Sequence, residues 1–161
     1  MKEDTKYTII QWPDIQYLMS ESDFSEHSYL VNDEQGIEDF GSSAYFVDTD
    51  WAEGIINRKK NETAHKSILK FIKRFQNEGT IKTFTQGCCF WFAVILKKRY
   101  SESDTYTQVL YSPVYNHFIT QIGVNFYDIT GEVSDKTYMS WDSYQSQYPN
   151  EAKKVIFDCI L

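Results

Sequence analysis

The sequence has no long run of apolar residues. A helix that spans a bilayer needs about 20 of them in succession, and no stretch of these 161 residues approaches that length. Residues 1–11 also lack the apolar centre of a secretory signal peptide. These absences argue against a membrane protein, and we expect a cytoplasmic protein with no membrane partner.

Cysteine is scarce, with 3 residues in the chain. Cys88 and Cys89 are adjacent and Cys159 lies far from them, which is not the spacing of a disulfide framework. The sequence also has no Cys-x-x-Cys pair, and its 3 histidines are far apart. We therefore expect reduced thiols, no metal and no cofactor.

Positive charge is in deficit. The chain has 16 Lys and Arg against 23 Asp and Glu, a formal net charge of -7. Direct binding of a nucleic acid needs clustered Lys and Arg, so we expect none. The acidic charge either keeps the protein soluble or faces a basic partner, and both interpretations stay open.

Aromatic residues, in contrast, are abundant at 17%, and a chain of this length buries roughly two thirds of its unfolded surface. The polar run NRKKNE at 57–62 separates two patterned segments and predicts a linker. We expect a small N-terminal α+β segment over residues 1–58 and a second domain over residues 62–161.

The N-terminal segment is predicted to hold three short strands, because β-branched and aromatic residues gather at 7–11, 28–31 and 44–47. Pro13 suits the first turn of a short helix that runs through Met19. A second helix is expected over 51–56.

The second domain is predicted to open with an amphipathic helix that Thr63 caps and Gly79 ends. A strand or extended loop is expected over 80–85. An apolar run that ends in basic residues then predicts a buried helix over 89–100.

Three further runs, 106–111, 117–122 and 125–129, predict an antiparallel meander with Gly123 in its last tight turn. Two C-terminal helices are expected, with Ser140 and Asn150 as their caps.

Cys89 is the candidate nucleophile, because the first turn of a helix stabilises a thiolate. His117, on a strand downstream, is the candidate base. A two-residue turn at Gly123 would place Asp128 diagonally opposite His117, where its carboxylate orients the imidazole. A three-residue turn would move it to the other face. Gln86 is a candidate donor to a developing oxyanion.

Each of these residues also has a purely structural interpretation. Cys89 fits a small core residue, His117 a hydrogen-bonded polar residue, Asp128 a turn residue and Gln86 a solvated loop residue.

Three segments carry a resemblance: Gln86 to Ala93, Asn116 to Phe118 and Tyr127 to Gly131. Together they resemble small phage and mobile-element proteins with a papain-like or NlpC/P60-like layout. The resemblance covers roughly residues 62–161. It places Cys89, His117 and Asp128 on the family's cysteine, histidine and acid.

The resemblance implies an α+β fold in which a helix carrying cysteine precedes an antiparallel β-meander. It also implies a cysteine peptidase or amidase that acts on a peptide or protein substrate, or a remnant of such a site kept as a scaffold.

A second function class follows from the likeness to phage-borne proteins. The N-terminal segment shows the same likeness through Trp12, Pro13, Asp14 and the run 41–47. This second class is an anti-defence protein, such as an anti-CRISPR, that binds a host defence effector through an acidic surface. Its candidate carboxylates are Asp23, Glu26, Asp33, Glu34, Glu38 and Asp39.

Overall fold

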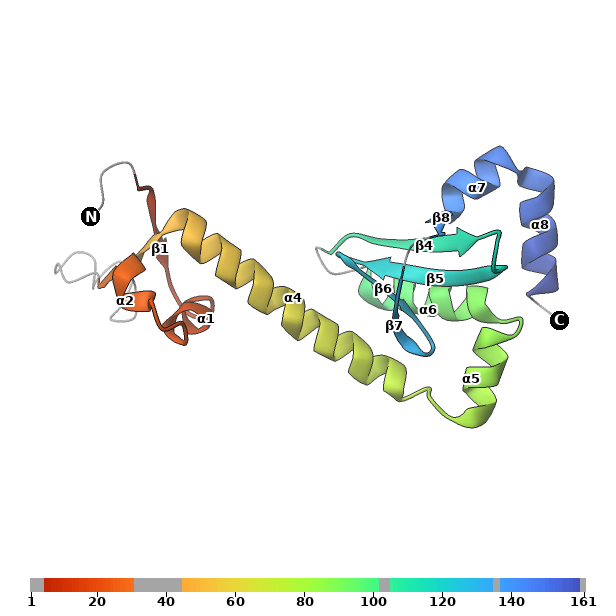
Figure 1. Ribbon diagram of the computed structural model, residues 1–161, viewed down its shortest axis with the longest axis horizontal. Helices are drawn as coiled ribbons and strands as arrows, with labels where there is room; N and C mark the ends of the chain where they lie inside the picture. Colours follow the sequence, from red (N-terminus) through yellow and green to blue (C-terminus); the bar gives the residue numbers. More distant parts are fainter. Residues whose placement is uncertain (1–4, 31–44, 102–104, 135–136, 160–161) are drawn as a thin grey trace. The chain divides into compact units, whose positions relative to one another are not determined.

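A computed structural model describes residues 5–30, 45–101, 105–134 and 137–159. The chain divides into two compact units, Met1–Ala64 and His65–Leu161. Both units combine helices with antiparallel strands, so the predicted α+β class is confirmed (Figure 1). Among the described residues, no helix combines the length and the apolar character that crossing a bilayer requires.

The first unit contains an antiparallel three-stranded sheet in the order β1-β3-β2, formed by β1 (Tyr7–Ile10), β2 (Ser28–Leu30) and β3 (Tyr45–Asp48). These strands confirm the three predicted ones where the chain is described; residues 31–44 lie outside the described part. Two short helices, α1 (Ile15–Met19) and α2 (Phe24–His27), lie between β1 and β2 in sequence.

The core of this unit consists of apolar side chains from α1, β3 and the start of α4. Its buried members are Ile15, Leu18, Val47, Ala52, Ile55 and Ile56.

Helix α4 (Thr49–Lys73) runs without interruption through the segment predicted to be a linker, so the chain passes from one unit to the next within a helix. The run at 57–62 consists largely of Lys, Arg, Glu and Asn, and the first three are strong helix formers even without an apolar stripe. Thr63 is correspondingly an interior residue rather than a cap, and its Oγ1 donates to the Lys59 carbonyl at 2.9 Å.

Helix α5 (Glu78–Thr85) replaces the strand or loop expected over 80–85, and Gly79 lies inside it instead of ending α4. The reason is a cap that the sequence interpretation missed. The Asn77 side chain accepts from the Thr80 N–H at 3.0 Å, and the Thr80 hydroxyl accepts in return from the Asn77 N–H at 3.2 Å.

Helix α6 (Cys89–Tyr100) begins and ends where the apolar run and its basic end predicted. It packs chiefly on the central strand β5 of the second sheet and lies along one face of that sheet (Figure 1). Phe92 and Leu96 of α6 are buried among Ile122, Tyr127 and Ile129 of the sheet and the loop that follows β6.

The second sheet has five strands in the order β7-β6-β5-β4-β8, all antiparallel. The predicted meander is confirmed as its centre: β4 (Thr107–Ser112), β5 (His117–Ile122) and β6 (Asn125–Asp128). The two outer strands, β7 (Gly131–Val133) and β8 (Met139–Ser140), are too short to leave a sequence pattern.

Two helices complete the second unit, α7 (Trp141–Gln147) and α8 (Pro149–Asp158). Ser140 precedes α7 as predicted, but its side chain forms no capping hydrogen bond. Pro149 begins α8, so Asn150 is not the cap, because proline suits the first helical position, where an N–H has no partner.

Candidate active site

Cys89 is the first residue of α6 and is buried, with 4% of its surface exposed. Gly87 leads the chain from α5 into α6 with φ 127°, a left-handed conformation that favours glycine. On the same helix, Phe92, Ala93 and Leu96 are buried as well. The sulfur therefore sits on a well-packed helix start.

His117 is the first residue of β5, directly after a tight turn from β4. The turn brings Asn116 to φ 46°, and the Asn116 Oδ1 accepts a hydrogen bond from the Tyr111 hydroxyl at 2.8 Å. This bond anchors Asn116 to the sheet and thereby helps to fix the backbone position of His117.

Asp128 is the last residue of β6 and meets His117 across the sheet. Thr120 pairs with Tyr127 and Ile122 pairs with Asn125, which is the predicted register of a two-residue turn at Gly123. Gly123 has φ 62°, as such a turn requires. The predicted diagonal contact is confirmed, with His117 Nε2 lying 3.0 Å from Asp128 Oδ2.

A neighbouring threonine holds the other carboxylate oxygen. The Thr130 backbone N–H and hydroxyl donate to Asp128 Oδ1 at 2.7 Å and 2.6 Å. Burial raises the pKa of the Asp128 carboxyl, but the hydrogen bonds from His117 and Thr130 outweigh burial and hold this pKa below its ordinary value. Asp128 is thus a carboxylate with a fixed orientation.

The imidazole of His117 is basic for the same reason. Burial lowers its pKa, but the hydrogen bonds to Asp128 and Cys89 outweigh burial and raise the pKa to about 9. Because Nε2 faces Asp128, the remaining ring nitrogen, Nδ1, is the one left for the thiol.

His117 lowers the pKa of the Cys89 thiol. Burial raises its pKa, yet the hydrogen bond and positive charge of His117, with backbone N–H groups of Phe118 and Phe90, bring the pKa below its ordinary value. The three shifts together favour a thiolate beside an imidazolium that a carboxylate holds, which is an arrangement suited to nucleophilic chemistry.

Gln86 directly follows α5 and is exposed, and its backbone N–H donates to the Lys82 carbonyl at 3.0 Å. None of the hydrogen bonds found in the described residues joins its amide to Cys89 or His117. The structure brings together the other three candidates, and the role of Gln86 as an oxyanion donor stays a prediction.

Tyr138 also borders the site, and sequence reasoning missed it. Its ring centroid lies 6.5 Å from that of His117, with the two rings edge to face. Burial and the negative charges of Asp128 and Cys89 raise the pKa of Tyr138 to about 12. The residue precedes the two-residue strand β8, so no periodic pattern marks it.

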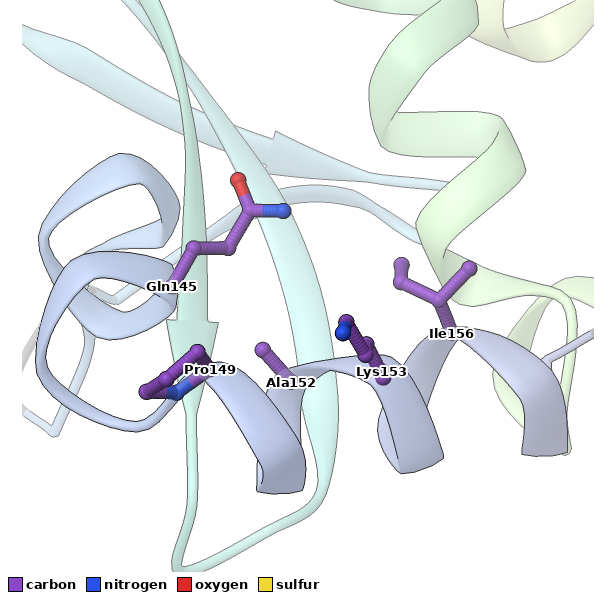
Figure 2. A pocket seen from close by; sticks show the side chains of 5 residues that line it. All are labelled: Gln145, Pro149, Ala152, Lys153 and Ile156. Carbon is purple, nitrogen blue, oxygen red and sulfur yellow. The ribbon is translucent and has the colours of Figure 1, made fainter.

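A cavity of about 390 Å³ lies elsewhere in the second unit, between α7 and α8. Figure 2 shows the side chains of Gln145, Pro149, Ala152, Lys153 and Ile156 around it. Cys89, His117 and Asp128 do not line it.

A protein-family model described as "Phage YunG-like protein" matches residues 57–155, more than half of the chain. Neither the curated proteins nor the solved structures include a significant match.

Proposed function

The chain belongs to the Phage YunG-like protein family, and we propose that it is a thiol hydrolase that cleaves an amide bond in a peptide or protein. One observation carries the proposal: Cys89, at a helix start, contacts a His117 imidazole that Asp128 holds at 3.0 Å. The proposed core is papain-like or NlpC/P60-like, because the cysteine lies on a helix and the histidine and acid lie on the next strands of an antiparallel sheet.

In the proposed reaction the Cys89 thiolate attacks the carbonyl carbon of the amide. The imidazolium of His117 then gives its proton to the departing amine, which leaves an acyl group on the sulfur. A water molecule, deprotonated by His117, cleaves this thioester and regenerates the thiolate. Asp128 keeps the imidazole ring in place through both steps.

The negative oxygen formed during attack needs hydrogen-bond donors. The backbone N–H of Cys89 is a suitable donor, because the first N–H groups of a helix have no partner within it. We assign the Gln86 amide as the second donor, as in the sequence analysis.

The first test compares two buried thiols of the same chain. Burial and its proximity to Cys89 raise the pKa of Cys159 to about 11, whereas that of Cys89 is lowered. Iodoacetamide at neutral pH is expected to label Cys89 at least about tenfold faster, since the thiolate is the reactive form. Equal labelling of the two would overturn the proposal.

The second test combines hydrolysis of fluorescently labelled casein with covalent labelling by an epoxysuccinyl peptide probe, whose epoxide the Cys89 thiolate opens to form a stable thioether. Cys89→Ser and His117→Ala should abolish turnover, and Cys88→Ser, at the half-buried neighbouring position, should retain it. Labelling of Cys89 without turnover of any amide would instead indicate the remnant of a site.

The alternative, an inhibitor that binds a host defence effector, stays a prediction. Four of its six candidate carboxylates, Asp33, Glu34, Glu38 and Asp39, lie outside the described residues. Of the other two, Asp23 accepts from the Trp51 indole N–H at 3.2 Å, and Glu26 is exposed.

A further inference from the structure

A second sulfur lies against the candidate nucleophile. Cys159 follows the last turn of α8 and is 7% exposed. The Trp91 indole N–H donates to the Cys159 carbonyl at 3.2 Å, which ties the end of α8 to the first turn of α6. Cys89 and Cys159 consequently belong to one packed cluster.

The pKa of Cys159 depends on Cys89. Burial is the main cause of the raised pKa of Cys159, and the charge of Cys89 and a hydrogen bond between the two side chains raise it further. The backbone N–H of Phe90 acts on both sulfurs. Their place in one buried cluster, and the hydrogen bond that ties Cys159 to Trp91 of the first turn of α6, bring the two thiols close together.

We propose that Cys89 and Cys159 form a redox-active pair, which a hydroperoxide converts into an intramolecular disulfide. The inference rests on the proposed function in one respect, since both need a reactive Cys89 thiolate.

The peroxide oxidises the two thiols in two steps. The Cys89 thiolate attacks one oxygen of the peroxide; an S–O bond forms, the O–O bond breaks, and the departing hydroxide takes a proton to give water. Cys159 then loses its proton and attacks the sulfur of the Cys89 sulfenic acid. An S–S bond forms, the S–O bond breaks, and the hydroxide leaves as a second water. Two thiols are oxidised and one peroxide is reduced.

Cys88 is the competing partner, and covalent geometry disfavours it. Disulfides usually join residues whose Cα atoms are about 4.4–6.8 Å apart, whereas neighbours across a trans peptide are about 3.8 Å apart. Cys88 also points in a direction about 100° around the helix axis from Cys89.

The disulfide would remove the nucleophile reversibly. A sulfenic acid without a partner thiol proceeds to sulfinic acid, which ordinary thiols do not reduce. Cys159 therefore protects Cys89 from permanent oxidation.

The test uses full-length Cys88→Ser, which retains only Cys89 and Cys159. The reduced protein is treated with hydrogen peroxide, blocked with iodoacetamide and digested with trypsin. Peptide 83–97, which carries Cys89, should be joined to peptide 155–161, which carries Cys159. Alkylation of Cys89 should be lost and should return after dithiothreitol.

The matched variants are Cys159→Ser and Cys159→Ala, with circular dichroism to check their fold. In both, Cys89 should gain oxygen atoms, and dithiothreitol should no longer restore its alkylation. Sulfinic acid on Cys89 of Cys88→Ser without a joined peptide, or a disulfide between two chains, would overturn the inference.

The outcomes also separate this inference from the hydrolase proposal. A Cys89–Cys159 disulfide in a protein that cleaves no amide would overturn only the hydrolase proposal. A protein that cleaves casein yet forms no such disulfide would overturn only the inference of a redox pair.

Discussion

His117 Nε2 and Asp128 Oδ2 are 3.0 Å apart across strands β5 and β6. The contact depends on strand register, because a slip of one residue would turn Asp128 to the opposite face of the sheet. Thr130 also holds Asp128 in place, because its backbone N–H and its hydroxyl both donate to Asp128 Oδ1. The imidazole therefore has one stable orientation, with its free nitrogen available to Cys89.

Asp128→Asn should lower the reactivity of Cys89. An opposite charge at hydrogen-bond distance shifts a pKa by about 1 to 3 units, so the His117 pKa should fall from about 9 toward its ordinary range. Alkylation of Cys89 at slightly acidic pH should slow by about tenfold or more. The measurement is the pH profile of iodoacetamide labelling, and Asp142→Asn, at an exposed carboxylate of α7, is the matched control.

Stability should depend on pH through His117. Its pKa is raised in the folded state from 6.5 to about 9, so its stabilising contribution is complete below pH 6.5 and is lost as the pH rises through about 9. Urea unfolding of the wild type and of His117→Gln should therefore show a difference that shrinks across this window. A difference that grows with pH would contradict the assignment.

Two glycines should respond to alanine with opposite signs. Gly123 has φ 62°, and an added Cβ would meet Thr105 Cγ2 at 3.4 Å, so Gly123→Ala should destabilise the second unit by about 1 kcal/mol. Gly54 lies within α4 with open space around it, and Gly54→Ala should stabilise the protein by about 0.5–1 kcal/mol. Thermal unfolding of each variant checks the signs.

Tyr127→Phe should cost about 1 kcal/mol of unfolding free energy. The buried Tyr127 hydroxyl is hydrogen-bonded to His65 Nδ1 at 2.7 Å, and the same nitrogen lies 3.2 Å from the Asn125 amide nitrogen. Removing the hydroxyl leaves the ring packing intact, so urea denaturation reports the hydrogen bond alone. The control is Tyr148→Phe, an exposed tyrosine, for which no change is expected.

The sequence predicted the site best where local rules and covalent geometry acted together. The apolar run and basic end of α6 placed Cys89 at a helix start, and Gly123 fixed a two-residue turn and thus the register of Asp128. These relationships depend on neighbours in the chain, which a sequence displays directly.

The errors have equally local causes. Thr and Phe residues at 80–85 suggested a strand, but the reciprocal cap between Asn77 and Thr80 starts a helix there. The charged run 57–62 suggested a linker because it has no apolar periodicity, although its composition favours a helix.

Tertiary neighbours could not be predicted. Tyr138 reaches His117, and Cys159 reaches Cys89, only through the packing of segments that follow the meander. No spacing in the sequence encodes those distances, and nothing in the immediate neighbourhood of either residue distinguishes it from a core residue.

The charge distribution around His117 also bears on kinetics. A ring with a pKa of about 9 already carries, at neutral pH, the proton that the departing amine of the proposed hydrolysis needs. Attack by a sulfur that is already ionised transfers no hydrogen, so heavy water should leave that step unchanged and slow only the later steps in which hydrogen moves. In the proposed hydrolase, the proton for the leaving group is therefore in place before substrate binds.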